Sequence, residues 1–190
     1  TELGLMISKE GLPDVEKQMD HMRERHHALV FRLLAQDLAK LMSVETLSDH
    51  LSLLADIMLE ETLYRCWVSL RIRYPHYPET PSFAVLGYGK LGGKELGYAS
   101  DLDLVFIYDD DQIDANDIYT KYVQRINSWL TTTTISGKLF DIDMQLRPDG
   151  SSGLLVHSKE AFEKYQKNKA WVWEHQALTR ARFVCGEVTL

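Results

Sequence analysis

One stretch of the chain, Phe83–Asp111, places an apolar run, a glycine-rich turn and two alternating aspartates in close succession. The apolar run Phe83–Leu86 is bounded by proline and glycine, which predicts a short buried strand that ends in a turn. Asp101 and Asp103 alternate with leucines, and side chains alternate faces along a strand, so both carboxylates are expected on one face. The fold therefore has to bring two strands and a flexible turn together beside a pair of acids.

Two neighbouring carboxylates repel each other, and a divalent cation is the simplest group that offsets this repulsion. Magnesium prefers oxygen ligands, commonly one or two carboxylates together with phosphate oxygens of a substrate. In the preceding turn, Gly89, Gly92 and Gly93 permit close backbone approach, and Lys90 or Lys94 can pair with phosphate. Either motif alone is also typical of an ordinary exposed strand or turn. Together they predict a metal–nucleotide site.

The glycine spacing of Gly87–Gly92 matches that of a dinucleotide-binding fingerprint, but the two aspartates follow too early to bind a ribose. A glycine pair, seven residues, and then Asp-hydrophobic-Asp-hydrophobic resembles instead the signature of the polymerase-beta-like nucleotidyltransferase superfamily.

A second stretch, Leu139–Gly150, alternates apolar residues with Asp141, Asp143, Gln145 and Arg147, which predicts a strand with one polar face. An ordinary strand with a solvated face gives the same pattern. A two-metal phosphoryl-transfer site, however, needs a third carboxylate on a neighbouring strand, and we assign Asp143 to it in preference to Asp141. Arg147 is a candidate phosphate contact, with a surface salt bridge as the alternative.

Helices are expected before and after these stretches. A helix opened by Pro13 and Asp14 runs toward Met42, and Ser43 caps a second one, which together predict a helical hairpin. Three prolines mark the end of the hairpin: Pro75, Pro78 and Pro81. The chain then divides into an N-terminal helical segment (1–80), a nucleotidyltransferase core (81–157) and C-terminal helices (158–190).

In the last two parts, Asp114 and Ser158 are expected to cap helices, and a further helix is expected from Ala170 to Gly186. The tryptophans of that last helix are expected in the core. Glu174 is expected in an interhelix hydrogen bond. The acidic turn after the Asp103 strand is expected to be solvated, and so are three clustered histidines: His21, His26 and His27.

Composition narrows the classes of partner. The chain has 190 residues with 21 basic and 28 acidic side chains, and the net charge of −7 argues against nucleic acid as a partner. No apolar stretch is long enough to span a membrane and no signal peptide is recognisable, which predicts a cytoplasmic protein. Cys66 and Cys185 have no partner at close spacing and are expected to be buried thiols. The missing initiator Met predicts a piece of a longer chain.

Three segments together resemble the glutamate–ammonia-ligase (glutamine synthetase) adenylyltransferase family: GYGKLGGKELGYASDLDLVFIYD, DIDMQLRPDGSSGLLVHSKEAFEKYQ and NKAWVWEHQALTRARFVCG. The family motif GxGKLGxxELxxxSDLDL falls on Gly87–Leu104, and D-x-x-L-R-P-x-G falls on Asp143–Gly150. One half of this bifunctional bacterial enzyme adenylylates a tyrosine of glutamine synthetase, and the other half removes the AMP. The segment Tyr165–Leu178 resembles the C-terminal, adenylylating half.

The resemblance implies an α+β fold, with a polymerase-beta-like mixed sheet flanked by helices and preceded by the helical hairpin. It implies ATP as a substrate and Mg²⁺, or alternatively Mn²⁺, as the metal held by Asp101, Asp103 and Asp143. The expected phosphate-binding residues are Gly89, Lys90, Gly92, Gly93 and Arg147, and Ser100 orients the loop or contacts a phosphate. Gln145 departs from the family pattern, in which a basic residue or a variable one is often found at this position.

The same resemblance implies glutamine synthetase as the protein substrate and a PII-type regulatory protein as a partner of the full-length enzyme, with a role in nitrogen assimilation. A helical domain is expected to follow the chain. Two alternatives stay open: the deadenylylating half of the same enzyme, and a non-catalytic nucleotide-sensing module. The retention of three mutually repelling acids argues against the silent module.

Overall fold

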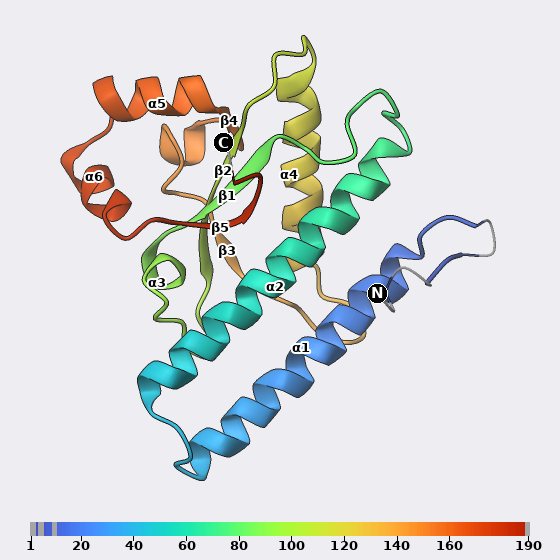
Figure 1. Ribbon diagram of the computed structural model, residues 1–190, viewed down its shortest axis with the longest axis vertical. Helices are drawn as coiled ribbons and strands as arrows, with labels where there is room; N and C mark the ends of the chain where they lie inside the picture. Colours follow the sequence, from blue (N-terminus) through green and yellow to red (C-terminus); the bar gives the residue numbers. More distant parts are fainter. Residues whose placement is uncertain (1–2, 4–5, 9–10, 189–190) are drawn as a thin grey trace.

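The computed structural model describes residues 3, 6–8 and 11–188. Its helices and strands follow in the order α1 (Val15–Leu38), α2 (Val44–Arg71), β1 (Phe83–Gly87), α3 (Gly89–Gly92), β2 (Leu102–Tyr108), α4 (Ala115–Thr131), β3 (Ile142–Asp143), β4 (His157–Ser158), α5 (Lys159–Asn168), α6 (Val172–Leu178) and β5 (Arg182–Gly186). A mixed sheet is flanked by helices and preceded by a helical hairpin (Figure 1), which confirms the expected α+β class.

The sheet is built around β2. The strand order is β3-β2-β1-β5, with β4 also paired to β2. Strand β1 is antiparallel to both β2 and β5, whereas β3 and β4 run parallel to β2, β3 against its beginning and β4 against its end. All residues of β2 except Asp103 are buried. The one charged side chain of this strand therefore lies beside the end of β3, opposite Asp143.

The two N-terminal helices begin where the sequence predicts. The Asp14 side chain accepts a hydrogen bond from the Lys17 amide at 3.2 Å, and that of Ser43 accepts one from Thr46 at 3.3 Å. Lys40, with φ of 57°, reverses the chain after α1, so the second helix runs back along the first (Figure 1). The helical hairpin is thus confirmed.

Arg23 ties the hairpin to the rest of the molecule. Its fully buried guanidinium donates to the carbonyls of Trp129 and Thr132, both at 2.7 Å, and to that of Gly137 at 2.8 Å. Burial lowers the pKa of this side chain. Residues of α2 also share one hydrophobic cluster with the sheet and α4. The expected division of the chain at residue 80 stays a prediction, and the parts pack as one core.

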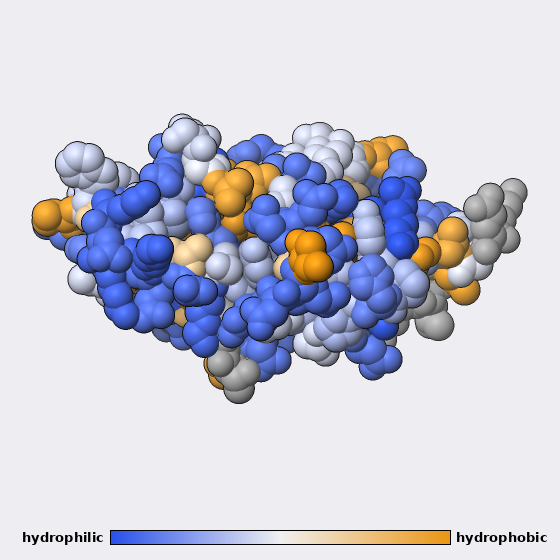
Figure 2. All heavy atoms as spheres, turned by 90° about the horizontal axis from the view of Figure 1, so that it is seen from above, coloured by the Kyte–Doolittle hydropathy of each residue, from blue (hydrophilic) through white to orange (hydrophobic). Residues whose placement is uncertain are grey.

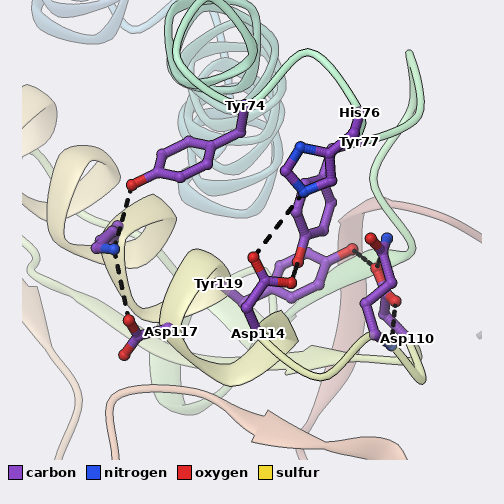
Figure 3. A network of polar contacts seen from close by, with 9 residues as sticks. Tyr74, His76, Tyr77, Asp110, Asp114, Asp117 and Tyr119 are labelled. Carbon is purple, nitrogen blue, oxygen red and sulfur yellow. Dashed lines mark hydrogen bonds and ion pairs between the residues drawn. The ribbon is translucent and has the colours of Figure 1, made fainter.

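The linker between α2 and β1 is fastened by a polar network (Figure 3). The Tyr77 hydroxyl donates to Asp114 Oδ1 at 2.7 Å, and the Tyr119 hydroxyl donates to Asp110 Oδ2 at 3.2 Å. Asp114 occupies the N-cap position of α4, but its side chain makes no capping hydrogen bond. The prediction that it caps the helix is wrong in this respect, because Tyr77 engages the carboxylate. Asp110 is half-buried and hydrogen-bonded to Tyr119, whereas the sequence predicts a solvated turn there.

The C-terminal prediction is corrected in two ways. The helix expected from Ala170 to Gly186 ends at Leu178, and β5 follows it. The β-prone run of β5 pairs with β1, whose backbone groups would otherwise form an open edge. Trp171 and Trp173 are 68% and 52% exposed, so they do not lie in the core as expected.

The strand predicted within Leu139–Gly150 is also shorter than expected, since β3 covers Ile142–Asp143 only. Asp143 Oδ1 accepts a hydrogen bond from the Gln145 amide at 2.7 Å, a local turn that competes with strand pairing. The acid nevertheless stays on the strand next to β2.

Two further expectations concern the surface and the thiols. None of the helices in the described ranges is both long enough and apolar enough to cross a membrane. The face shown in Figure 2 is mostly hydrophilic, with separate hydrophobic patches. Cys66 and Cys185 are buried free thiols, as predicted, and burial raises the pKa of each.

Candidate active site

Strands β2 and β3 bring the predicted acids together. Asp103 lies opposite Asp143 in the parallel register, and Asp101 directly precedes β2. The pKa of Asp103 is raised, first by burial and then by the charges of Asp101 and Asp143, while the Lys90 ammonium opposes the shift. The residues that sequence reasoning assigned from three separate segments therefore share one electrostatic neighbourhood.

The glycine turn is seated directly on Asp103. Gly89 has φ of +52°, a conformation that favours glycine, and a Cβ on it would lie 2.2 Å from Asp103 Oδ2. The amide of Tyr88 also donates to the Asp103 carbonyl at 2.9 Å. The turn between β1 and α3 is thus fixed against the strand that carries the acids.

Gly92 and Gly93 have a role that the sequence did not reveal. A Cβ on Gly92 would lie 1.9 Å from the carbonyl oxygen of Arg180, and one on Gly93 would lie 2.6 Å from the Arg180 guanidinium. Both glycines therefore let the segment before β5 pack closely on the turn. Their place in a phosphate cradle stays a prediction.

Lys90 belongs to the short helix α3, and Ser100 belongs to the loop that follows it. The Ser100 hydroxyl accepts a hydrogen bond from the Gly97 amide at 3.0 Å, which orients the loop that leads to Asp101. Lys90 is exposed on α3 and its charge reaches Asp103. Of the two roles considered for Ser100, the structure shows the loop-orienting one, and a phosphate contact of either residue is untested.

Arg147 is used inside the loop that follows β3. It is 9% exposed, and its guanidinium donates to the carbonyls of Met144 at 2.6 Å and Ser151 at 3.2 Å. These bonds hold the loop in a compact turn beside β3. The arginine therefore shapes the loop next to Asp143, and its contact with a phosphate stays a prediction.

Asp101, Asp103 and Asp143 have the donor atoms that a divalent cation prefers, but they are not arranged closely enough to bind one. Carboxylate oxygens are the ligands that magnesium and manganese accept. Across residues 3, 6–8 and 11–188, however, no three His, Cys, Asp or Glu side chains are gathered closely enough to hold a metal ion. Asp101, Asp103 and Asp143 thus fit a metal in donor type, charge and strand position, and they have to turn toward one another to bind it.

A small hollow lies beside the acids. It has a volume of about 170 Å³ and lies between the two hairpin helices and the loop segments 96–100 and 138–141, with Ser100 and Asp141 in its lining. Small-molecule pockets commonly have volumes of about 300–1,000 Å³. The hollow is therefore too small for a whole nucleotide, and Asp101, Asp103 and Asp143 do not line it.

Sequence reasoning missed the environment of His26. Its ring is half-buried and meets Phe140 edge-on, with 4.8 Å between the ring centroids. Burial, followed by the charge of His27, lowers the pKa of His26 to about 4. The expectation of a solvated histidine is wrong here, because α1 packs over the segment that leads into β3. No spacing in the sequence signals that long-range contact.

The prediction for Glu174 is confirmed. Its buried carboxylate accepts a hydrogen bond from the Tyr165 hydroxyl at 3.0 Å, which links α6 to α5. It also accepts one from the Trp171 amide at 2.6 Å. The carboxylate therefore joins two helices.

Comparison with known proteins identifies the family. A family model described as "Glutamate-ammonia ligase adenylyltransferase" matches residues 5–190. The chain belongs to this family. The motif resemblance is thereby confirmed over nearly the whole chain.

Several curated relatives carry the name "Bifunctional glutamine synthetase adenylyltransferase/adenylyl-removing enzyme". The one from Aromatoleum aromaticum is 60% identical over 178 residues, which is 94% of this chain and 19% of the relative. The one from Chromobacterium violaceum is 58% identical over 92% of this chain and 19% of the relative. The one from Nitrosomonas europaea is 55% identical over 98% and 20%. The chain spans about a fifth of the length of these relatives.

Proposed function

We propose that the chain is the adenylylating unit of a glutamine synthetase adenylyltransferase, which moves AMP from ATP to a tyrosine of glutamine synthetase. One observation carries the proposal. Asp103 lies opposite Asp143 on the neighbouring strand, and the glycine turn is seated on the Asp103 carboxylate. A nucleotidyl transfer needs an acidic site beside a turn that can approach phosphates, and the family motifs supply both from the same residues.

In the proposed reaction the phenol oxygen of the substrate tyrosine attacks the α-phosphorus of ATP. A new phosphorus–oxygen bond forms, the bond to the β-phosphate oxygen breaks, and pyrophosphate leaves with the bonding electrons. Asp143, opposite Asp103 and on the more accessible strand, accepts the phenol proton. The protein contributes position and charge, because little covalent chemistry falls to its own groups.

Asp101, Asp103 and Asp143 would hold Mg²⁺ or Mn²⁺. Such a cation, when bound, supplies the positive charge that neutralises the triphosphate and lowers the pKa of a phenol. Burial, and then the charges of Asp101 and Asp143, raise the pKa of Asp103, and a bound cation would relieve that repulsion.

The glycine turn and Lys90 bind the phosphates in this proposal. Gly89 brings backbone close to Asp103, and Lys90 adds a positive charge whose effect reaches that acid. Arg147 holds the loop after β3 through the carbonyls of Met144 and Ser151, and so fixes the approach to Asp143. Whether its guanidinium also contacts the nucleotide is part of the proposal to be tested.

The adenylylating half is preferred to the deadenylylating half on the sequence of Tyr165–Leu178. A PII-type regulatory protein would act through other parts of the longer enzyme, since the chain spans about a fifth of its relatives. The cytoplasmic location expected from the sequence is part of the same proposal, because the substrate is an enzyme of nitrogen assimilation.

The decisive assay incubates the 190-residue chain with glutamine synthetase, ATP and either Mg²⁺ or Mn²⁺. Mass spectrometry then measures the mass of the glutamine synthetase subunit. We expect a mass increase of one AMP per modified subunit, and none with Asp103→Asn. Phosphate-dependent loss of AMP from adenylylated glutamine synthetase, without the forward reaction, would assign the chain to the deadenylylating half. Nucleotide binding without either reaction would favour the sensing module.

A further inference from the structure

The glycine turn, which we call the nucleotide turn and define as residues 87–95, contacts a second part of the molecule besides Asp103. The segment that leads into β5 packs against it so closely that a Cβ on Gly92 would meet the Arg180 carbonyl, and one on Gly87 would lie 2.7 Å from Val184 Cγ2. The turn is therefore enclosed between the acid strand and β5. A shift of β5 would move Gly89 relative to Asp103.

Arg182, the first residue of β5, makes the polar link between these parts. Its Nε donates to the carbonyl of Leu91 at 3.0 Å, and its Nη2 donates to Asp56 Oδ1 at 2.7 Å. Leu91 is fully buried within α3, and Asp56 belongs to α2. One guanidinium thus joins the nucleotide turn to the helical hairpin, although the three residues come from distant parts of the sequence.

The environment makes this link stronger than a surface ion pair. The side chains of Arg182 and Asp56 are only 19% and 21% exposed, so solvent screens the pair less than it screens pairs on the open surface. The Leu91 carbonyl lies at the end of a four-residue helix, where only weak local donors such as the Lys94 amide, at 3.3 Å, reach it. A charged donor on that carbonyl fixes the position of the turn.

We infer that Arg182 is a positioning residue for the nucleotide turn, and that it transmits the position of α2 to the site through Asp56. This inference rests on the proposed nucleotide site. The planar guanidinium can hold the carbonyl and the carboxylate at once, whereas a lysine ammonium at this position can hold only one of them well. Loss of the link loosens the turn and weakens nucleotide binding.

The test compares four variants with the wild type: Arg182→Gln, Arg182→Lys, Asp56→Asn and Arg65→Gln. Amide hydrogen exchange across residues 88–95 reports the turn directly, and calorimetry reports the Kd for ATP with Mg²⁺. Arg182→Gln is expected to speed exchange across the turn and to raise the Kd about tenfold, if loss of this hydrogen bond leaves about a tenth of the molecules with the turn in its binding-competent position. Arg182→Lys and Asp56→Asn are expected to give smaller changes of the same kind.

Arg65→Gln is the matched control. It removes an arginine–carboxylate pair of similar exposure, Arg65 Nη2 to Glu61 Oε1 at 2.6 Å, within α2 itself. Arg65→Gln should lower the melting temperature without faster exchange across residues 88–95. If Arg182 only stabilised the fold, Arg182→Gln would give the same result.

Unchanged exchange across residues 88–95 in Arg182→Gln overturns the inference, and so does faster exchange with an unchanged Kd. If the wild type binds no ATP with either metal, the proposed function fails, and the transmission of α2 position to a nucleotide site fails with it. The exchange result would then still decide whether Arg182 positions the turn.

Discussion

Gly89 and Asp103 pack so closely that only glycine fits at position 89: the Cβ of any other residue there would lie 2.2 Å from Asp103 Oδ2. The glycine belongs to the turn after β1, and the acid belongs to β2, which runs antiparallel to β1. The family motif that carries both residues is therefore a packing requirement as well as a chemical one.

Gly89→Ala is expected to abolish ATP binding while the chain still folds. The new methyl group has to displace the Asp103 carboxylate, and alanine at φ of +52° is strained by about 1 kcal/mol. Calorimetric titration with ATP, together with thermal unfolding, measures the two effects. Gly97→Ala is the matched control, because its Cβ would meet only Ser100 Oγ, at 3.7 Å. Equal ATP affinity in the two variants would refute the assigned role of Gly89.

Asp103→Asn is expected to stop AMP transfer without unfolding the chain. The amide keeps the shape of the side chain, removes a negative charge that Asp101 and Asp143 repel, and binds a cation poorly. In the presence of a chelator the variant should melt no lower than the wild type. An assay with labelled AMP measures the transfer, and a melting curve measures the stability. Full transfer activity of Asp103→Asn would show that Asp103 is not part of the active site.

The raised pKa of Asp103 also predicts a pH dependence of stability. Because the folded state binds this proton more tightly than the unfolded state, the charged acid destabilises the fold above its raised pKa, and this penalty is lost as the pH falls toward 3.8. The difference in melting temperature between Asp103→Asn and the wild type, in chelator, should therefore be largest near neutral pH and shrink in acid. A difference that grows as the pH falls would contradict the shift.

The lowered pKa of His26 predicts a pH dependence of stability in the opposite direction. Its pKa is lowered to about 4 from an ordinary 6.5, so the neutral ring contributes stability that is complete above pH 6.5 and is lost as the pH falls toward 4. His26→Leu should lose less stability than the wild type over this interval. Urea unfolding at several pH values measures the loss, with the exposed His50→Leu as control. Parallel losses in wild type and His26→Leu would show that the ring is not buried neutral.

The acids could be located from the sequence because their signal is local. Asp103 alternates with leucines that β2 buries, and Asp143 lies within an alternating run, so a period of two residues was enough to assign their strands, with Asp101 directly before β2. Ser43 and Ser158 were likewise recognisable as caps before apolar repeats, and both accept the expected amide hydrogen bonds.

The contacts around the turn could not be predicted, because they join residues far apart in the chain. Gly92 faces the Arg180 carbonyl, and Arg182 reaches both Leu91 and Asp56; no local pattern encodes these distances. The same limit explains the error after Leu178. The apolar spacing there fits a helix as well as a strand, and only pairing with β1 decides between them.

Binding of ATP with and without metal tests the central claim most directly. Calorimetric titrations of the wild type and of Asp143→Asn are made with ATP in Mg²⁺ and again in excess chelator. We predict that the wild type binds ATP much more tightly with Mg²⁺ than with chelator, and that Asp143→Asn loses most of this difference. Equal affinity of the wild type under both conditions would contradict the assignment of Asp101, Asp103 and Asp143 to a metal–nucleotide site.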